Sequence, residues 1–170
     1  RIAGGGTGQA HYRRLDVTGQ TDWQAAIPEA EQALGGLSAL FNNAGTVGTG
    51  SVTDTNPKDF RRTPAINLTG AYLGIHLSAP ALKRAGGGVI VNTSSPAGLQ
   101  RYGGLAAYMS SKRGPRGLDR AAALDLAPDN IRVLSLHPGP ISTPMTEDMP
   151  DEVARMLRFM LCEAGYSTGS

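Results

Sequence analysis

A tyrosine and a lysine four residues apart, Tyr108 and Lys112, are the residue types that proton transfer to or from a hydroxyl requires. In a helix, this spacing places both side chains on one face, one turn apart. A lysine ammonium beside the phenol favours the phenolate and lowers a tyrosine pKa that is ordinarily about 10. A phenol with a lowered pKa can serve as general acid and base near neutral pH. The pair therefore predicts oxidation of an alcohol or reduction of a ketone.

Ser95, thirteen residues before Tyr108, is the third candidate. It follows an apolar run that is predicted to be a strand, and its hydroxyl would hold the substrate oxygen opposite the phenol. A Tyr-x-x-x-Lys pattern also arises by chance, so the elements that surround these residues decide whether the interpretation holds.

The elements that must position these residues alternate between short apolar runs and helical patterns. Four apolar runs are predicted to be buried strands: residues 11–15, 37–41, 88–92 and 131–136. Helical patterns cover residues 22–34, 54–66, 67–85, 108–126 and 151–161. Thr21 is a candidate N-cap of the first helix, Gly35 is its expected end, and Pro57 suits a first helical turn.

Strands that alternate with helices predict an α/β protein with a doubly wound parallel sheet. Ligands of such sheets bind beyond the carboxyl ends of the strands. Polar and glycine-containing segments lie at these ends, at residues 42–45, 95 and 138–143. Their placement supports a ligand site at this edge of the sheet.

Composition limits the remaining function classes. The 170 residues carry a formal net charge of +2, and the basic residues are scattered, which argues against a nucleic-acid partner. We expect one domain covering residues 1–170. One cysteine, Cys162, excludes an internal disulfide and fits a reducing compartment. No apolar run reaches about 18 residues and no signal-peptide pattern is present, so we expect a cytoplasmic protein without a membrane partner.

A metal site is not expected. The three histidines, His11, His76 and His137, are far apart in the sequence and have no acidic or cysteine companions at the spacing that metal ligands require.

Several motifs follow one another in an order that is typical of a known family. The segments are Asn42-Asn43-Ala44-Gly45, Asn67-Leu68-Thr69-Gly70, Asn92-Thr93-Ser94-Ser95, His137-Pro138-Gly139 and Thr143-Pro144-Met145. Together with Tyr108 and Lys112 they resemble the classical short-chain dehydrogenase/reductases (SDRs). The resemblance covers roughly residues 11–147 well and 151–169 loosely. Residues 121–146 look most like the bacterial hydroxysteroid dehydrogenase-like branch.

The resemblance implies a catalytic set of four residues. Tyr108 is the expected acid and base, and Lys112 lowers its pKa and binds the ribose of the nicotinamide. Ser95 polarises the substrate oxygen. Asn67 matches the fourth catalytic position of the family, where a helix irregularity lets the backbone carbonyl hold a water for proton relay.

The resemblance also implies NAD or NADP as cofactor, with hydride transfer between the nicotinamide C4 and a carbinol carbon. Asp16, followed by Val17, matches the position that hydrogen-bonds adenine, and Asn43, Ala44 and Gly45 would line the adenosine side. The carboxamide would be cradled by Pro138, Gly139 and Thr143. The choice between NAD and NADP cannot be made, because the residue that decides it after the second strand of the family is not present in the sequence.

The sequence departs from the family at both ends, which predicts an incomplete Rossmann-like sheet. The first βαβ unit with its glycine-rich phosphate loop and the last strand have no counterpart. Residues 4–8 are glycine-rich, but no strand leads into them, so we interpret them as a flexible connector. Without the central strand, residues 11–15 must rearrange, pair with another chain or stay poorly ordered.

Prolines alter the surroundings of the catalytic residues. Pro115 lies inside the predicted catalytic helix and removes one backbone hydrogen bond, at a cost of about 3 kcal/mol in a regular helix. Pro64 strains the helix end before Asn67, and Pro96 favours an extended backbone at Ser95.

The expected function is NAD(P)-dependent oxidoreduction of a small-molecule secondary alcohol or ketone, with steroid-like substrates as one option. The helices that begin near Asn67 and Tyr108 match those that the family uses for assembly, which implies a homodimer or homotetramer. A non-catalytic remnant that acts as a binding or assembly partner is the alternative. A sugar epimerase or dehydratase ranks last, because those relatives are longer and carry a substrate domain.

Overall fold

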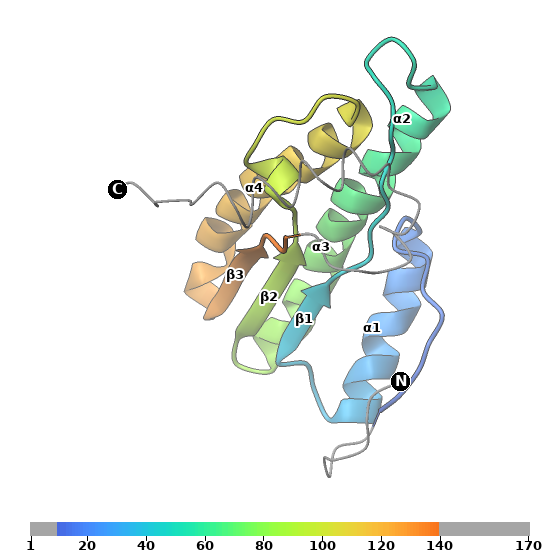
Figure 1. Cartoon of the computed structure of the whole chain (residues 1–170). Coiled ribbons are helices and arrows are strands. Elements are labelled where there is room, and N and C mark those ends of the chain that lie inside the picture. Colours follow the sequence, from blue (N-terminus) through green and yellow to red (C-terminus); the bar gives the residue numbers. More distant parts are fainter. Residues whose placement is uncertain (1–9, 140–170) are drawn as a thin grey trace.

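A three-stranded parallel sheet with helices packed on one face forms the described part of the molecule, residues 10–139, in a computed structural model (Figure 1). The strands are β1 (Ala39–Asn42), β2 (Gly88–Thr93) and β3 (Ile131–Leu136), in the order β1-β2-β3. The helices are α1 (Gln20–Leu34), α2 (Pro57–Pro64), α3 (Gly70–Arg84) and α4 (Ala106–Leu126), with a π-helical turn (Ala65–Thr69) and two 3-10 turns (Pro96–Gly98, Ala127–Asp129).

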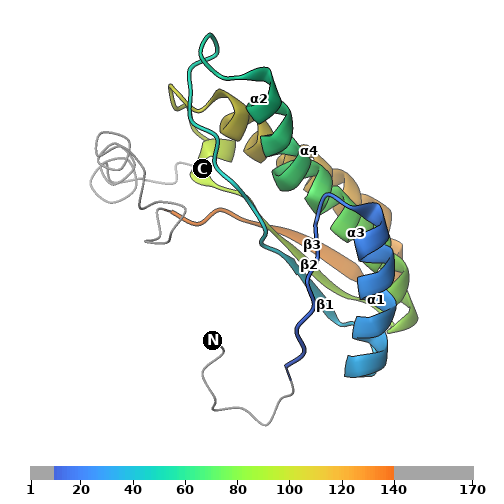
Figure 2. The same cartoon turned by 90° about the vertical axis from the view of Figure 1, so that its right-hand side faces the viewer.

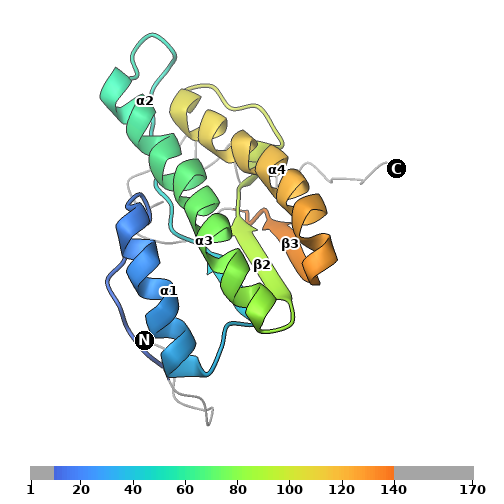
Figure 3. The same cartoon turned by 180° about the vertical axis from the view of Figure 1, so that it is seen from behind.

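The sheet confirms the predicted parallel α/β architecture. β2 pairs in parallel with both neighbours, and its residue Val91 lies opposite Phe41 on one side and Leu134 on the other. The helices α1, α3 and α4 lie on the same face of the sheet (Figures 2 and 3). None of the helices within residues 10–139 is long and apolar enough to cross a bilayer.

The core lies between the sheet and these helices. Ile90, Ile131 and Val133 point from the strands into this layer and pack against Leu82 and Ala122 of α3 and α4. Because successive side chains of a strand point to opposite faces, the intervening residues point the other way.

The opposite face of the sheet is apolar and exposed. Phe41, Leu134 and Leu136 are 56%, 48% and 46% exposed, respectively. No helix of the described part of the chain covers this face (Figure 2). The helical layer that would make the sheet doubly wound is therefore present on one side only within residues 10–139.

The prediction of a strand at residues 11–15 is wrong. This segment has no regular structure and runs along α1, where Arg13 pairs with Glu29 (Figure 1). A strand needs a hydrogen-bonded neighbour, and in the described sheet β1 pairs with β2 alone. The segment has rearranged, which is one of the three outcomes that the sequence allowed.

Helix boundaries follow the predictions with small shifts. The N-cap of α1 is Gly19 and not Thr21, and the helix ends as expected at Gly35, which has a φ of 74°. Pro57 is the first residue of α2, and the Asn56 side chain caps this helix by accepting from the Lys58 N–H. α4 continues through Pro115, which is fully buried. The predicted helix at residues 151–161, the connector at residues 4–8 and Thr143 lie outside the described residues.

Candidate active site

Three elements bring the four predicted catalytic residues to the carboxyl edge of the sheet. Ser95 follows β2, Tyr108 and Lys112 occupy the first turns of α4, and Asn67 lies in the π-helical turn before α3. Ser95 has an extended backbone (φ −167°, ψ 161°), as expected for a residue before proline. The Ser95 side chain acts on the Tyr108 phenol as a hydrogen-bonding group that lowers its pKa.

Burial dominates the protonation of Tyr108. It raises the pKa of the phenol because the phenolate loses solvation, and the hydrogen bond with Ser95 opposes this effect without reversing it. The expectation that Lys112 lowers this pKa is wrong for the geometry observed. The Lys112 amine lies 5.8 Å from the centre of the Tyr108 ring and donates to the backbone carbonyl of Thr93 over 2.8 Å.

Lys112 is a buried amine. The residue is 5% exposed, and loss of solvation lowers its pKa from 10.5 to about 8. At neutral pH the amine is mainly charged, and the Thr93 carbonyl is a hydrogen-bond acceptor for it. The site therefore holds a protonated phenol and a readily deprotonated amine on one helix face.

The helix irregularity expected at Asn67 is present. The Gly70 N–H bonds to the carbonyl of Ala65, five residues earlier, which is the spacing of a π-helix. The Asn67 side chain turns inward and makes two bonds of 2.8 Å with the backbone of Thr46, one with its N–H and one with its carbonyl. The residue thereby attaches the π-helical turn to the loop after β1.

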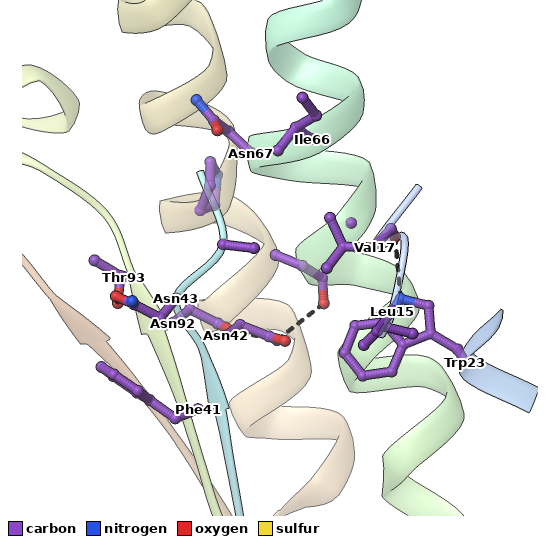
Figure 4. Close-up of a pocket in the computed structure, with 14 residues that line it drawn as sticks. Leu15, Val17, Trp23, Phe41, Asn42, Asn43, Ile66, Asn67, Asn92 and Thr93 are labelled. Carbon is purple, nitrogen blue, oxygen red and sulfur yellow. Dashed lines mark hydrogen bonds between the residues drawn. The ribbon is translucent and has the colours of Figure 1, made fainter. Parts of the chain in front are cut away.

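A pocket of about 190 Å³ opens beside Asn67, and Ser95, Tyr108 and Lys112 do not line it (Figure 4). Val17, Asn43, Ala44 and Asn67, all predicted site residues, line it. The Trp23 indole donates to the Val17 carbonyl over 3.0 Å and holds that segment against the pocket.

Gly45 lies next to the pocket at a crowded position. A Cβ there would be 3.3 Å from the Asn67 amide oxygen and 3.6 Å from the Lys112 amine. Glycine at this position therefore lets the backbone approach both side chains closely.

The remaining predicted cofactor residues are more scattered. The Asp16 carboxylate accepts from the N–H and hydroxyl of Thr18, over 2.9 and 2.8 Å, and these bonds lower its pKa. Asp16 closes a turn and does not line the pocket. Pro138 and Gly139 come one residue after the end of β3, at the same edge of the sheet as Ser95.

Comparison with known proteins identifies the family. Residues 3–154 match the family model described as short chain dehydrogenase. The chain belongs to the short-chain dehydrogenase family. It is 47% identical over 137 residues to a trans-4-hydroxycyclohexanecarboxylate dehydrogenase of Sinomonas cyclohexanicum, an alignment covering 81% of the chain and 52% of that protein. It is 42% identical over 176 aligned residues to a 3-alpha-(or 20-beta)-hydroxysteroid dehydrogenase of Mycobacterium tuberculosis, covering 95% of the chain and 68% of the relative.

The fold agrees with solved structures of the family. A short-chain type dehydrogenase/reductase from Mycobacterium marinum superposes with a TM-score of 0.82 at 32% identity, covering 88% of this chain and 60% of that one. The chain thus spans about half to two thirds of the length of these relatives.

This short-chain dehydrogenase chain contains polar contacts that sequence reasoning missed. Asn42 donates to the Asn92 side chain over 2.7 Å, and Asn92 donates to the Asp119 carboxylate over 2.6 Å. The Ser135 hydroxyl donates to the other carboxylate oxygen. The network joins all three strands to α4. The sequence feature that could have indicated Asp119 is its seven-residue spacing from Lys112, which places both side chains on one helix face.

Two further residues of this short-chain dehydrogenase chain contact the predicted catalytic residues. Ser111 bonds to Asn67 and to the backbone of Tyr108. The Nδ1 atom of His137 lies 3.0 Å from the carbonyl oxygen of Ser95. His137 belongs to the His137-Pro138-Gly139 motif, but no sequence pattern distinguished Ser111 from an ordinary helix residue.

Proposed function

We propose that the protein is an NAD(P)-dependent oxidoreductase that interconverts a ring-bearing secondary alcohol and the corresponding ketone. The observation that carries the proposal is the buried Lys112 amine, which lies 5.8 Å from the centre of the Tyr108 ring on the same helix, at the edge of the sheet where Ser95 follows β2. The names of relatives support the substrate class, because they include dehydrogenases of hydroxysteroids, cyclopentanol and cyclohexanol.

The described residues fit the adenosine side and the nicotinamide ribose of a dinucleotide, at the carboxyl edge of the sheet. Ala44, which has a small side chain, lines the pocket there. Gly45 leaves the space beside Asn67 and Lys112 that a Cβ would fill. When bound, the nicotinamide would supply or accept the hydride. Asn43, Ala44 and Val17 would hold its adenosine side, and Lys112 would donate to the ribose.

Proton transfer in this proposal belongs to Tyr108 and Ser95. Because burial raises the pKa of Tyr108, the phenol is protonated at neutral pH and can give its proton to a carbonyl oxygen. The Ser95 hydroxyl would donate a hydrogen bond to the same oxygen. The raised pKa of Tyr108 favours ketone reduction near pH 7. The rate of alcohol oxidation would increase at higher pH, where more of the phenol is ionised.

We further infer that the Asn67 carbonyl holds a relay water, that the chain is a single domain and that it assembles as a homodimer or homotetramer. A cytoplasmic location is consistent with a single cysteine.

Cofactor binding tests the proposal. The 170-residue chain would be titrated with NADH and NADPH while cofactor fluorescence is followed, alongside Tyr108→Phe. We expect saturable binding in the micromolar range, that is about −8 kcal/mol. Tyr108→Phe should bind within about threefold of the wild type but reduce cyclohexanone at least ~100-fold more slowly, because it lacks the proton donor.

The same titration can refute the proposal. No saturable binding of either cofactor up to ~1 mM, an affinity weaker than about −4 kcal/mol, would favour the non-catalytic alternative. Equal turnover by Tyr108→Phe would remove the phenol from the mechanism.

A further inference from the structure

Ser111 joins the π-helical turn to the catalytic helix. Its side chain is fully buried, at 0% exposure. The hydroxyl accepts a hydrogen bond of 2.8 Å from the Asn67 amide and donates one of 2.7 Å to the backbone carbonyl of Tyr108. The Ser111 hydroxyl thus contacts two of the four predicted catalytic residues. Ser111 itself immediately precedes a third, Lys112, in the sequence.

The contact with Ser111 completes the hydrogen bonding of the Asn67 side chain. The amide oxygen accepts from the Thr46 N–H, and the amide nitrogen donates to the Thr46 carbonyl and to Ser111. That amide oxygen and the Lys112 amine face Gly45 at 3.3 and 3.6 Å from the position of its missing Cβ. The hydrogen bond that holds Asn67 to α4 therefore also fixes one wall of the space that contains the Lys112 amine.

Pro115 makes this turn of α4 weaker than a regular helix. Proline has no N–H, so the carbonyl of Ser111, four residues earlier, lacks its usual helical donor. The bonds of the Ser111 hydroxyl to Asn67 and to Tyr108 hold the same turn from its inner side.

We propose that Ser111 is a positioning residue, whose hydroxyl fixes the π-helical turn to α4 and thereby keeps the Lys112 amine in its buried place. The description of that amine as catalytic rests on the proposed function, whereas the positioning itself does not. Without the hydroxyl, the contact between Asn67 and α4 is lost and water reaches the amine.

The titration of Lys112 measures this effect directly. The chain contains only three lysines, Lys58, Lys83 and Lys112. In protein labelled with ¹³C at the lysine ε-carbon, the resonance lost in Lys112→Met identifies Lys112. In the wild type it should titrate with a pKa of about 8.

Ser111→Ala should raise the pKa of Lys112 by about one unit, a tenfold change in its proton affinity, because hydration favours the charged amine. Ser111→Cys should act in the same direction, since it fills the site with a slightly larger side chain but replaces the hydroxyl with a weak donor. The matched control is Ser110→Ala. Ser110 is exposed and its hydroxyl donates only to the Ala106 carbonyl within α4, so the pKa of Lys112 should not change.

A purely structural role makes a different prediction. If either folded Ser111 variant loses stability but keeps the pKa of Lys112 at the wild-type value, the proposal is overturned. A shift in Ser110→Ala as large as that in Ser111→Ala would also overturn it. The measurement needs neither cofactor nor turnover, so failure to bind NADH or NADPH would defeat the proposed function and leave the result for Ser111 interpretable.

Discussion

Lys112 is the residue at which burial and charge conflict most clearly. Its pKa is about 8 in the folded chain, against 10.5 for an ordinary lysine. Below pH 8 the amine is protonated in both the folded and the unfolded state, so the cost of burying the charge is present in full. Between about pH 8 and 10.5 the unfolded state binds more protons, so the free energy of unfolding rises with pH. The raised pKa of Tyr108 acts oppositely above about pH 10, where unfolded tyrosine ionises.

Lys112→Met should remove this pH dependence. From pH 8 to 10, we expect the wild type to gain stability at no more than about 1.4 kcal/mol per pH unit, and the variant to show a flatter profile. Urea unfolding at pH 7, 8, 9 and 10 measures both slopes. Parallel slopes in the two proteins would show that Lys112 is not the group responsible.

The spacing of residues in the sequence predicted where the side chains lie better than it predicted their pKa values. The four-residue spacing of Tyr108 and Lys112 and the proline after Ser95 correctly predicted a shared helix face and an extended backbone. The direction of the Tyr108 pKa was wrong, because it depends on burial, which the spacing of residues in a sequence does not reveal. Ser111 was missed because a serine beside a lysine in a helix has no distinguishing pattern.

At the scale of elements, the Asp119 carboxylate ties α4 to two strands. It accepts from Asn92 of β2 and from Ser135 of β3. Burial raises the pKa of Asp119 despite these two donors. A carboxyl with a raised folded-state pKa contributes stability that is present at low pH and is lost as pH rises through that pKa. At neutral pH the charged form is therefore a net cost that the hydrogen bonds partly offset.

Asp119→Asn should separate the charge from the hydrogen bonds. The amide can still accept from Asn92 and can donate to the Ser135 hydroxyl. We expect the variant to equal the wild type or to exceed it by up to about 1 kcal/mol at pH 7, with the difference shrinking at pH 4. Asp119→Ala should instead cost about 2 kcal/mol at pH 4 and less at pH 7, because it leaves the buried Asn92 amide unpaired but also removes the charge that costs stability at pH 7. Urea unfolding at the two pH values tests this. An Asn variant as unstable as the Ala variant would contradict it.

Element boundaries were predictable where the local sequence is decisive. β3 was predicted at its observed bounds, since a mainly apolar run with the β-branched residues Ile131 and Val133 starts directly after the turn at Asn130. Residues 11–15 were also predicted to be a strand, with Tyr12 and Leu15 as their apolar residues, but they form none. Strand formation depends on a pairing partner elsewhere in the chain, and a local pattern carries no information about that partner.

The whole molecule has two dissimilar sheet faces. The helix-covered face packs Ile90, Ile131 and Val133, whereas the other presents Phe41, Leu134 and Leu136 to solvent in the described part of the chain. Register places Phe41 and Leu134 on either side of Val91, so the exposed side chains form one continuous patch. Contiguous apolar patches of this kind bind apolar molecules or other proteins.

The double variant Phe41→Ser/Leu134→Ser should bind an anilinonaphthalene sulfonate dye more weakly than the wild type. We expect at least about a twofold loss of dye fluorescence, and a smaller change in stability than a core substitution gives, since both side chains are already exposed. Leu124→Ser is the control, because Leu124 is 78% exposed on α4 and belongs to the helical layer. Dye fluorescence that is equal in the wild type and the double variant would show that the patch is covered in solution.

Within residues 10–139 one face of the sheet is apolar and solvated, which has a thermal consequence. Heat capacity rises on unfolding because apolar surface becomes hydrated, and surface that is hydrated already in the folded state adds nothing to this rise. We therefore expect calorimetry of this chain to give less than the usual ~12 cal/mol/K per residue. Its stability curve should be correspondingly flat, with stability changing little between cold and moderate temperatures.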